Sequence, residues 1–157
     1  MKKDTITFVC TANVCRSPMA EMLMKKALSE EDEPLKSLKI VSTGVSALSG
    51  DAASLNSVKA LEPLGISLSE HKSKRLSHEI INSSIAIFCM TESHRSLIKM
   101  YYEALPCEVY LMREFFSKET PELPDPFGQN LDTYMECRDR MLESIPSLIE
   151  FCKKEVI

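Results

Sequence analysis

The residues best suited to chemistry stand near the start of the chain, where Cys10 is followed by Arg16 and Ser17 in the pattern C-x5-R-S. A cysteine thiolate is a strong nucleophile, and an arginine guanidinium binds two oxygens of a phosphoryl group at once through its planar fork of donors. The serine hydroxyl can donate a hydrogen bond to the sulfur. The spacing therefore predicts a phosphate-binding loop with a nucleophile at one end and a cation at the other.

The sequence on either side places this loop between a strand and a helix. Residues 6–9 form an apolar run typical of a buried strand, and Pro18 stands near the first turn of a helix expected over residues 17–28. Backbone N–H groups at a helix N-terminus lack partners within the helix, and the helix dipole is positive there. Both effects favour a bound anion and a thiolate at Cys10. A merely structural cysteine, the alternative, would leave this position unexplained.

Asp125 is the second chemical candidate, and it stands between Pro124 and Pro126 in a segment that ends Phe127-Gly128. The prolines restrict the backbone, and a carboxyl group fixed on a stiff loop suits proton transfer. Asp-Pro and Phe-Gly are also ordinary turn dipeptides. The local sequence alone therefore leaves both catalysis and a simple turn open.

Hydrophobic patterning predicts that strands and helices alternate along the chain. Further strands are expected at residues 39–42, 84–90 and 108–111, and further helices at about 54–64, 92–104 and 131–153. This alternation predicts an α/β fold, a single domain over residues 1–157 with a central parallel four-stranded sheet and helices on both faces. Ligands bind at the carboxyl ends of such strands, so we expect Cys10, Ser42 and Thr91 to face one crevice.

Composition excludes several classes of protein. The net charge of -4 disfavours a nucleic-acid partner, and no apolar run reaches membrane-spanning length. The six cysteines include no C-x-x-C pair and the three histidines have no metal-ligand spacing with them, so we expect free thiols and neither a metal nor a cofactor. The N-terminus shows no secretory leader. We therefore expect a cytoplasmic protein, a monomer or weak dimer that does not bind membranes.

Together these motifs resemble the low-molecular-weight protein tyrosine phosphatase family, in its bacterial branch close to protein arginine phosphatases. The family's loop C-x-G-N-x-C-R-S-P matches residues 10–18, its late acid motif D-P-[YF] matches residues 125–127, and its S-[AT]-G turn matches residues 42–44. The resemblance covers nearly the whole chain. It implies the low-molecular-weight phosphatase fold and a cysteine-dependent phosphatase that acts on a phosphorylated protein.

The resemblance also implies a role for each matching residue. Cys10 attacks phosphorus to give a phosphocysteine, Arg16 and the loop amides stabilise the phosphoryl oxygens, and Asp125 protonates the leaving group and then activates water. Asn13, Ser42 and His71 match a polar network that holds the loop in shape, and Asn13 is also expected among the residues that bind the phosphate. The other matching residues would bind the phosphate or the substrate: Thr11, Ala12, Asn13, Val14, Cys15, Ser17 and Phe127.

Three loop positions deserve separate expectations. Ala12 stands where the family usually has glycine, so a steric cost is expected there. Cys15 matches a cysteine that can form a disulfide with the nucleophile, and packing as a small apolar residue is the alternative.

Val14 stands where arginine phosphatases carry threonine and tyrosine phosphatases usually carry isoleucine, and it lacks a hydroxyl that could bind a phosphoguanidinium. We therefore expect phosphotyrosine as the substrate. Phosphoarginine is the alternative, because other segments look more like the arginine branch.

Two further functions fit less well. A thiol-dependent arsenate reductase relays oxidation through additional cysteines on a mobile segment, whereas Cys89 lies inside an apolar strand with no second thiol within short reach. A non-catalytic phosphoprotein-binding module would have no need of Cys10, Arg16 and Asp125 together.

Overall fold

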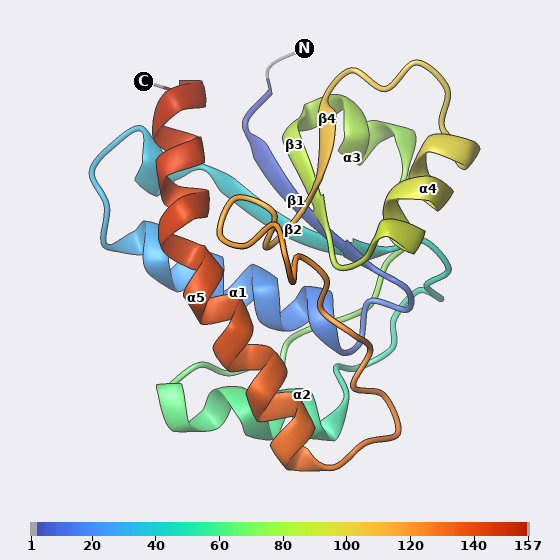
Figure 1. Ribbon diagram of the computed structural model, residues 1–157, viewed down its shortest axis with the longest axis vertical. Coiled ribbons are helices and arrows are strands. Elements are labelled where there is room, and N and C mark those ends of the chain that lie inside the picture. Colours follow the sequence, from blue (N-terminus) through green and yellow to red (C-terminus); the bar gives the residue numbers. More distant parts are fainter. Residues whose placement is uncertain (1–2, 157) are drawn as a thin grey trace.

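Four parallel strands form one sheet, and helices cover both of its faces (Figure 1). This computed structural model describes residues 3–156. The strands stand in the order β2-β1-β3-β4. Their bounds are β1 (Thr5–Cys10), β2 (Lys39–Gly44), β3 (Ser84–Cys89) and β4 (Glu108–Leu111). The helices are α1 (Arg16–Ser29), α2 (Leu55–Leu61), α3 (His78–Ser83), α4 (Glu92–Tyr101) and α5 (Leu131–Val156), with the short 3-10 helices η1 (Leu35–Ser37) and η2 (Glu62–Leu64). The predicted α/β class and parallel four-stranded sheet are confirmed.

Alternation along the strands divides the core into two apolar clusters. Ile6 and Phe8 of β1 point to the face covered by α1 and α5, whereas Val9 points to the face covered by α3 and α4. Side chains on both sides of the central strands are therefore buried, and their sequences read as continuous apolar runs. With both faces covered by helices, a ligand is expected at the carboxyl edge of the sheet.

Cys10 lies at the point where the order of the strands in the sheet reverses. β1 pairs with β2 on one side and with β3 on the other, so the connections that leave the two neighbours diverge beyond its carboxyl end. Cys10 is the last residue of β1, and it lies in register with Gly44, the last residue of β2. The loop that follows Cys10 therefore opens into the space between two connections.

The helices differ from expectation in three places. The helix expected at 54–64 is divided into α2 and η2, and Gly65 ends it with a φ of 72°. α4 ends at Tyr101 and does not reach Ala104, whose φ of 50° is incompatible with a right-handed helix. The six-residue α3 was not expected, because fewer than two turns carry too little periodic pattern to reveal a helix.

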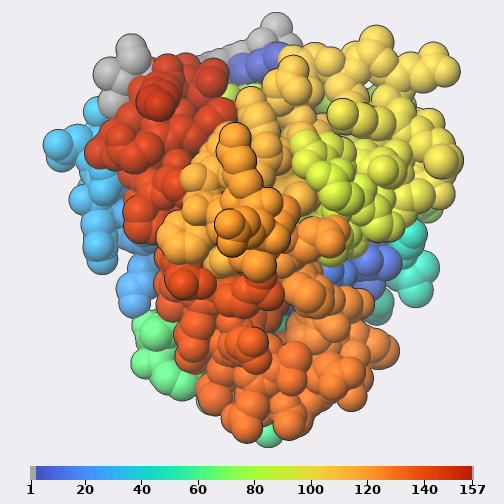
Figure 2. All heavy atoms as spheres, viewed as in Figure 1, coloured from blue at the N-terminus to red at the C-terminus, as the bar shows by residue number. Residues whose placement is uncertain are grey.

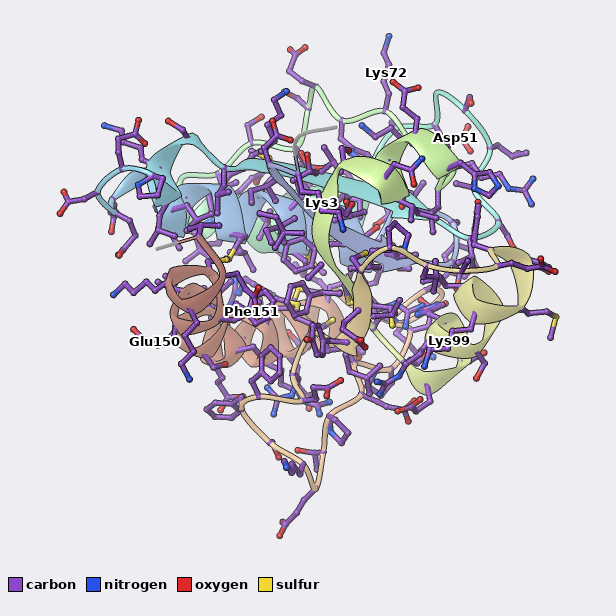
Figure 3. The ribbon with its side chains drawn as sticks, turned by 90° about the horizontal axis from the view of Figure 1, so that it is seen from above. Lys3, Asp51, Lys72, Lys99, Glu150 and Phe151 are labelled. Carbon is purple, nitrogen blue, oxygen red and sulfur yellow. The ribbon has the colours of Figure 1, made fainter. Side chains whose placement is uncertain are left out.

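The segment between β4 and α5 lies on the same face of the molecule as α5 (Figure 2). Aromatic rings hold the end of α5 against the sheet: Phe151, labelled in Figure 3, has its ring centroid 5.5 Å from that of Phe88 on β3 and 5.4 Å from that of Phe115. The first part of the segment between β4 and α5 is therefore packed against the end of α5 through Phe115. Within residues 3–156, the structure has no helix that combines the length and apolar character needed to span a membrane.

Candidate active site

A pocket of about 220 Å³ opens at the carboxyl end of β1. It is lined by residues of the loop after β1 and of the segment before α5, namely Cys10, Thr11, Ala12, Val14, Cys15, Arg16, Asp125 and Phe127. The three residues expected to be catalytic, Cys10, Arg16 and Asp125, therefore meet in one place, although more than a hundred residues separate the last from the first two.

Arg16, the first residue of α1, is buried and held in a defined orientation. Its side chain is 4% exposed, and its Nη1 donates to the carbonyl oxygen of Leu123 at 2.9 Å. Its Nη2 lies 3.7 Å from Oδ2 of Asp125 and 3.5 Å from Oγ1 of Thr11. Its Nε is buried and has no hydrogen-bond partner within residues 3–156. A buried cationic nitrogen without a partner costs free energy, and a bound anion would relieve that cost.

Ser17 lies directly behind the sulfur of Cys10. Its Oγ is 3.0 Å from Cys10 Sγ, accepts a hydrogen bond from Nδ2 of Asn13 at 2.8 Å and lies 3.1 Å from the carbonyl oxygen of Thr43. A hydroxyl has only one proton to donate. If Cys10 is a thiolate, Ser17 donates to the sulfur. If Cys10 is a thiol, the S–H group donates to Ser17, which then donates to Thr43. The serine expected at the sulfur is therefore in place for either protonation state.

Asn13 holds the loop from behind. It is fully buried with a φ of 59°, a left-handed conformation that asparagine tolerates better than most residues. Its Nδ2 also donates to Ser42 Oγ at 3.0 Å, and its Oδ1 accepts from the backbone N–H of Lys74 at 2.9 Å. His71 Nε2 donates to the carbonyl oxygen of Asn13 at 2.7 Å. The expected network of Asn13, Ser42 and His71 is therefore present as a set of hydrogen bonds.

Two residues expected to bind phosphate do not line the pocket with their side chains. The side chains of Asn13 and Ser17 belong to the supporting network, so only their backbone groups are candidates for binding an anion. The network also extends further than expected, because Glu21 on α1 accepts a hydrogen bond from Ser42 Oγ at 2.6 Å. The sequence pattern did not indicate this role, since an acidic residue on a helix is usually solvated.

The segment on the far side of this network is held by backbone pairing. Ser73 N–H donates to the carbonyl oxygen of Asp51 at 2.8 Å, and Asp51 N–H donates to Ser73 Oγ at 2.9 Å. Figure 3 shows Asp51 and Lys72 on the two adjacent connections at this edge. Because Lys74 N–H binds Asn13, the pairing fixes the backbone on which the phosphate loop rests.

Asp125 stands at the mouth of the pocket. Its side chain is 51% exposed, and its Oδ1 accepts from the backbone N–H of Phe127 at 3.0 Å. The chain just before it is fastened to the sheet, because Leu123 N–H donates to the carbonyl oxygen of Met90 at 2.9 Å. Arg140 of α5 also donates to the carbonyl oxygen of Glu122 at 3.0 Å. The carboxyl group is thus open to solvent on a segment that is held in position.

His94 is a residue near the pocket that the sequence did not reveal. It is 4% exposed, and its Nε2 lies 2.9 Å from Oγ1 of Thr11. Burial and the positive charge of Arg16 lower the pKa of His94 to about 4, against a smaller raising effect of Asp125. The ring is therefore neutral at physiological pH. Thr91, which we expected at the crevice, lies 3.3 Å from the other ring nitrogen of His94 through its Oγ1.

The expectations for Ala12 and Cys15 have different outcomes. Ala12 is exposed and its φ is not positive, so the steric cost expected from its methyl group does not arise. The sulfur of Cys15 is buried, free and 3.5 Å from Oη of Tyr134 on α5. It packs against the core, as the alternative role requires, and it also lines the pocket. A disulfide with Cys10 stays a prediction.

Three other cysteines are deeply buried. Burial raises the pKa values of Cys89, Cys137 and Cys152 to about 12. These thiols remain protonated at neutral pH, and a protonated thiol is a poor nucleophile and a poor redox partner. Within residues 3–156, the histidine, cysteine and carboxylate side chains form no group that could hold a metal ion.

Comparison with known proteins gives a consistent result. The family model described as low molecular weight phosphotyrosine protein phosphatase matches residues 5–157. The chain is 33% identical over 150 residues to a protein-arginine-phosphatase of Bacillus subtilis, an alignment that covers 96% of this chain and 97% of the relative. It is also 33% identical over 144 residues to the low molecular weight protein-tyrosine-phosphatase PtpB of Staphylococcus haemolyticus, covering 91% and 96%.

A solved structure agrees with these sequence relatives. It is that of the arginine phosphatase YwlE, in a mutant whose active-site serine, in place of a cysteine, is phosphorylated. It superimposes with a TM-score of 0.85 and 32% identity, over 97% of each chain. The likeness thus extends over the whole fold. The equal identities to arginine and tyrosine phosphatases leave the choice of substrate to the chemistry of the pocket.

Proposed function

The chain belongs to the low molecular weight phosphotyrosine protein phosphatase family, and from this premise we propose that it hydrolyses phosphotyrosine in phosphorylated proteins through a phosphocysteine intermediate on Cys10. The observation that carries the mechanism is the convergence of Cys10, Arg16 and Asp125 on one pocket. A nucleophile, a cation and an acid in one cavity are the groups that phosphoryl transfer to a protein side chain requires.

In the first step the sulfur of Cys10 attacks phosphorus, and the bond from phosphorus to the tyrosine oxygen breaks. Protonated Asp125 gives its proton to the departing phenolate oxygen, so tyrosine leaves as the neutral phenol. Asp125 suits this task because it stands at the mouth of the pocket, where the leaving group would exit. The phosphoryl group remains on the sulfur of Cys10.

In the second step water attacks the phosphocysteine. Asp125, now ionised, takes a proton from the water, and the bond from sulfur to phosphorus breaks to release inorganic phosphate. Ser17 supports both steps, because its hydroxyl can donate to the Cys10 thiolate. This thiolate is the nucleophile of the first step and the leaving group of the second. The enzyme returns to its initial state with Asp125 protonated and Cys10 ionised.

The charge on the transferred phosphoryl group is stabilised by fixed donors. Arg16 offers Nε, which has no hydrogen-bond partner among residues 3–156, together with Nη2 at the pocket edge. Backbone N–H groups of residues 11–17 and the positive end of α1 add further donors, and the supporting network keeps the loop in shape before substrate arrives. Such preorganised groups do not have to reorient during the reaction.

The walls of the pocket favour an aromatic leaving group. Val14, Ala12 and Phe127 present apolar surface, and the side chain of Phe127 stands 70% exposed at the rim, where it could contact a substrate ring. A phosphoguanidinium carries several N–H donors, and a pocket that leaves such donors unpaired disfavours the ligand. Val14 has no hydroxyl to accept from them. This contrast supports phosphotyrosine.

Phosphoarginine is the alternative substrate. The named arginine phosphatase of Bacillus subtilis is as similar in sequence as the tyrosine phosphatase of Staphylococcus haemolyticus. Asp125 could accept hydrogen bonds from a guanidinium at the pocket mouth. An arsenate reductase is less consistent with the site, because burial raises the pKa of Cys89 to about 12 and keeps this thiol protonated. A non-catalytic binding module is less consistent with it, because Cys10, Arg16 and Asp125 line one pocket.

Steady-state hydrolysis of matched peptides that carry phosphotyrosine or phosphoarginine tests the proposal, with Cys10→Ser as the blank. We expect a higher kcat/KM for the phosphotyrosine peptide. A preference for phosphoarginine would reverse the choice of substrate while keeping the mechanism. Binding of either peptide without turnover would support the binding-module alternative. The expectations of a cytoplasmic enzyme, of one domain over residues 1–157, of a monomer or weak dimer, and of no cofactor or metal stay predictions.

A further inference from the structure

We propose that His94 is a positioning residue for the phosphate pocket, which it serves by fixing the hydroxyl of Thr11 and, through that hydroxyl, the Nη2 edge of Arg16. The inference rests on the proposed function, because it concerns the same pocket. It assigns a role to a residue of α4 that no sequence motif marks.

The start of α4 brings His94 to the pocket. The helix begins at Glu92, just beyond the carboxyl end of β3, and the side chain of Thr91 caps it by accepting from the backbone N–H of His94 at 3.4 Å. The imidazole then lies with Nε2 2.9 Å from Thr11 Oγ1 and Nδ1 3.3 Å from Thr91 Oγ1. Both ring nitrogens have protein partners, so the ring is oriented from both sides.

The Thr11 hydroxyl links His94 to Arg16. Arg16 Nη2, 3.5 Å from Thr11 Oγ1, only donates, so this contact uses a lone pair of the hydroxyl oxygen. His94 Nε2 either accepts the one proton of that hydroxyl or donates to its second lone pair. In either tautomer the hydroxyl has a fixed direction, whereas without His94 it could rotate away from the guanidinium.

Fixing Nη2 matters because the three nitrogens of Arg16 have different partners. Nη1 is bound to the carbonyl oxygen of Leu123, and Nε is buried with no partner in the described part of the chain. A single bond at Nη1 does not set the plane of the guanidinium. Nη2 faces the half-exposed Asp125 carboxylate at 3.7 Å, beyond hydrogen-bond length, and the contact at Thr11 supplies the second hydrogen-bonded point. A planar fork binds two phosphoryl oxygens only when its plane is aligned with them, and small errors of placement reduce the rate.

The charge of His94 is compatible with this role. Its lowered pKa keeps the ring neutral at pH 7, so no second cation competes with Arg16 for Thr11. Asp125 is the other charged group that affects the ring. Nearby on α4, Glu92 and Arg95 pair with each other. A histidine that merely filled space would not need its Nε2 at 2.9 Å from a hydroxyl that lines the pocket.

Four variants test the proposal. His94→Leu removes both ring nitrogens, Thr11→Val removes the hydroxyl, and a double variant removes both. His94→Gln keeps a polar group that can reach Thr11. The matched control is His78→Leu, because His78 is exposed and its ring contacts Tyr102 outside the pocket. Affinity for inorganic phosphate is measured by calorimetry in the Cys10→Ser background, and kcat and KM are measured with intact Cys10. The first readout tests the pocket even if the wild-type protein has no turnover.

We expect His94→Leu and Thr11→Val each to lower kcat/KM and phosphate affinity about tenfold, the effect of losing one hydrogen bond to a charged network. The double variant should have the same kcat/KM and phosphate affinity as the more impaired of the two single variants, because both substitutions remove the same contact. His94→Gln should recover most of the loss, and His78→Leu should match the wild type.

Unchanged phosphate affinity in His94→Leu would overturn the proposal, as would losses that multiply in the double variant. If His94→Leu does not fold, Thr11→Val and His94→Gln decide: wild-type affinity in Thr11→Val would overturn the proposal, and reduced affinity there with near wild-type affinity in His94→Gln would support it. An absence of wild-type turnover would contradict the proposed function alone.

Discussion

Gly44 lies so close to the backbone of Thr11 that a Cβ atom at position 44 would stand 2.5 Å from the Thr11 carbonyl oxygen. It would also stand 2.9 Å from the backbone nitrogen of Asn13. Ser46 N–H donates to the same Thr11 oxygen at 2.9 Å, so the end of β2 supports the phosphate loop directly. Glycine is required here by the close approach of two backbones.

Gly44→Ala should therefore displace the phosphate loop. Overpacking against backbone atoms costs roughly 1–3 kcal/mol of stability, and a loop shifted by a few tenths of an ångström should lose at least tenfold in kcat/KM. Urea unfolding and steady-state kinetics measure the two effects. Gly65→Ala is the control: position 65 has open space but a φ of 72°, so stability should fall by about 1 kcal/mol with kcat/KM unchanged. Equal activity in the two variants would contradict the prediction.

Asp125→Asn should reduce kcat most for poor leaving groups. The amide keeps an oxygen that can accept from Phe127 N–H, but it cannot supply a proton. We expect a loss of roughly 10²–10³ in kcat on a phosphotyrosine peptide, and a smaller loss on 4-nitrophenyl phosphate, whose phenolate leaves without protonation. Asp139→Asn, at an exposed aspartate paired with Arg138, serves as the control. The same loss on both substrates would remove Asp125 from the role of acid.

Val14→Thr should shift specificity toward phosphoarginine. Threonine has the shape of valine, and its hydroxyl would give the pocket wall an acceptor for a guanidinium N–H. We expect the ratio of kcat/KM for phosphoarginine to that for phosphotyrosine to rise about tenfold, the effect of one well-placed hydrogen bond. Competition between the two peptides measures the ratio. Val58→Thr, at a partly buried valine of α2, controls for the added hydroxyl. A ratio unchanged by Val14→Thr would show that position 14 does not select the substrate.

The low pKa of His94 should make stability depend on pH in a definite direction. The folded value of about 4 lies below the ordinary value of 6.5, so the unfolded chain binds a proton first as the pH falls. The contribution of His94 to the free energy of unfolding should therefore be constant above about pH 7 and decline between about pH 6.5 and 4. At pH 5 the decline should be about 2 kcal/mol relative to pH 8. Urea unfolding at pH 8 and pH 5 should show a smaller decline for His94→Gln than for the wild type. Parallel declines would indicate that His94 titrates normally in the folded protein.

The strands and the catalytic candidates could be predicted from the sequence because their signals are local. The buried strands are short apolar runs, and Cys10, Arg16 and Ser17 stand within one loop whose position between strand and helix follows from its neighbours. The convergence of Asp125 on that loop could be expected only from the family resemblance, since Asp-Pro-Phe-Gly alone is an ordinary turn. The pocket contains it because Leu123 is bound both to Arg16 and to the end of β3.

The features that the sequence did not reveal depend on contacts between distant segments. His94 acquires its role from a hydroxyl 83 positions away, and Glu21 from one 21 positions away. Neither separation along the sequence belongs to a helical or strand periodicity, so no sequence pattern indicates either contact. The side chains of Asn13 and Ser17 face Ser42 and the Thr43 carbonyl oxygen and do not line the pocket, which likewise depends on contacts between distant segments. Residue type identified them as polar loop residues, but only the path of the backbone shows that their side chains point into the support.

The central claim is that the phosphoryl group passes through the sulfur of Cys10, and trapping the intermediate tests it most directly. The Asp125→Asn enzyme, in which attack of water should be slowed, is mixed with 4-nitrophenyl phosphate, whose phenolate leaves without protonation. The enzyme is then denatured rapidly, and its peptides are mapped by mass spectrometry. The account predicts one phosphoryl group on the peptide that contains Cys10. The same group should appear in a Cys152→Ser control and be absent in Cys10→Ala, which has no side-chain nucleophile at position 10. Release of 4-nitrophenolate with no phosphorylated peptide, or phosphate on another residue, would contradict it.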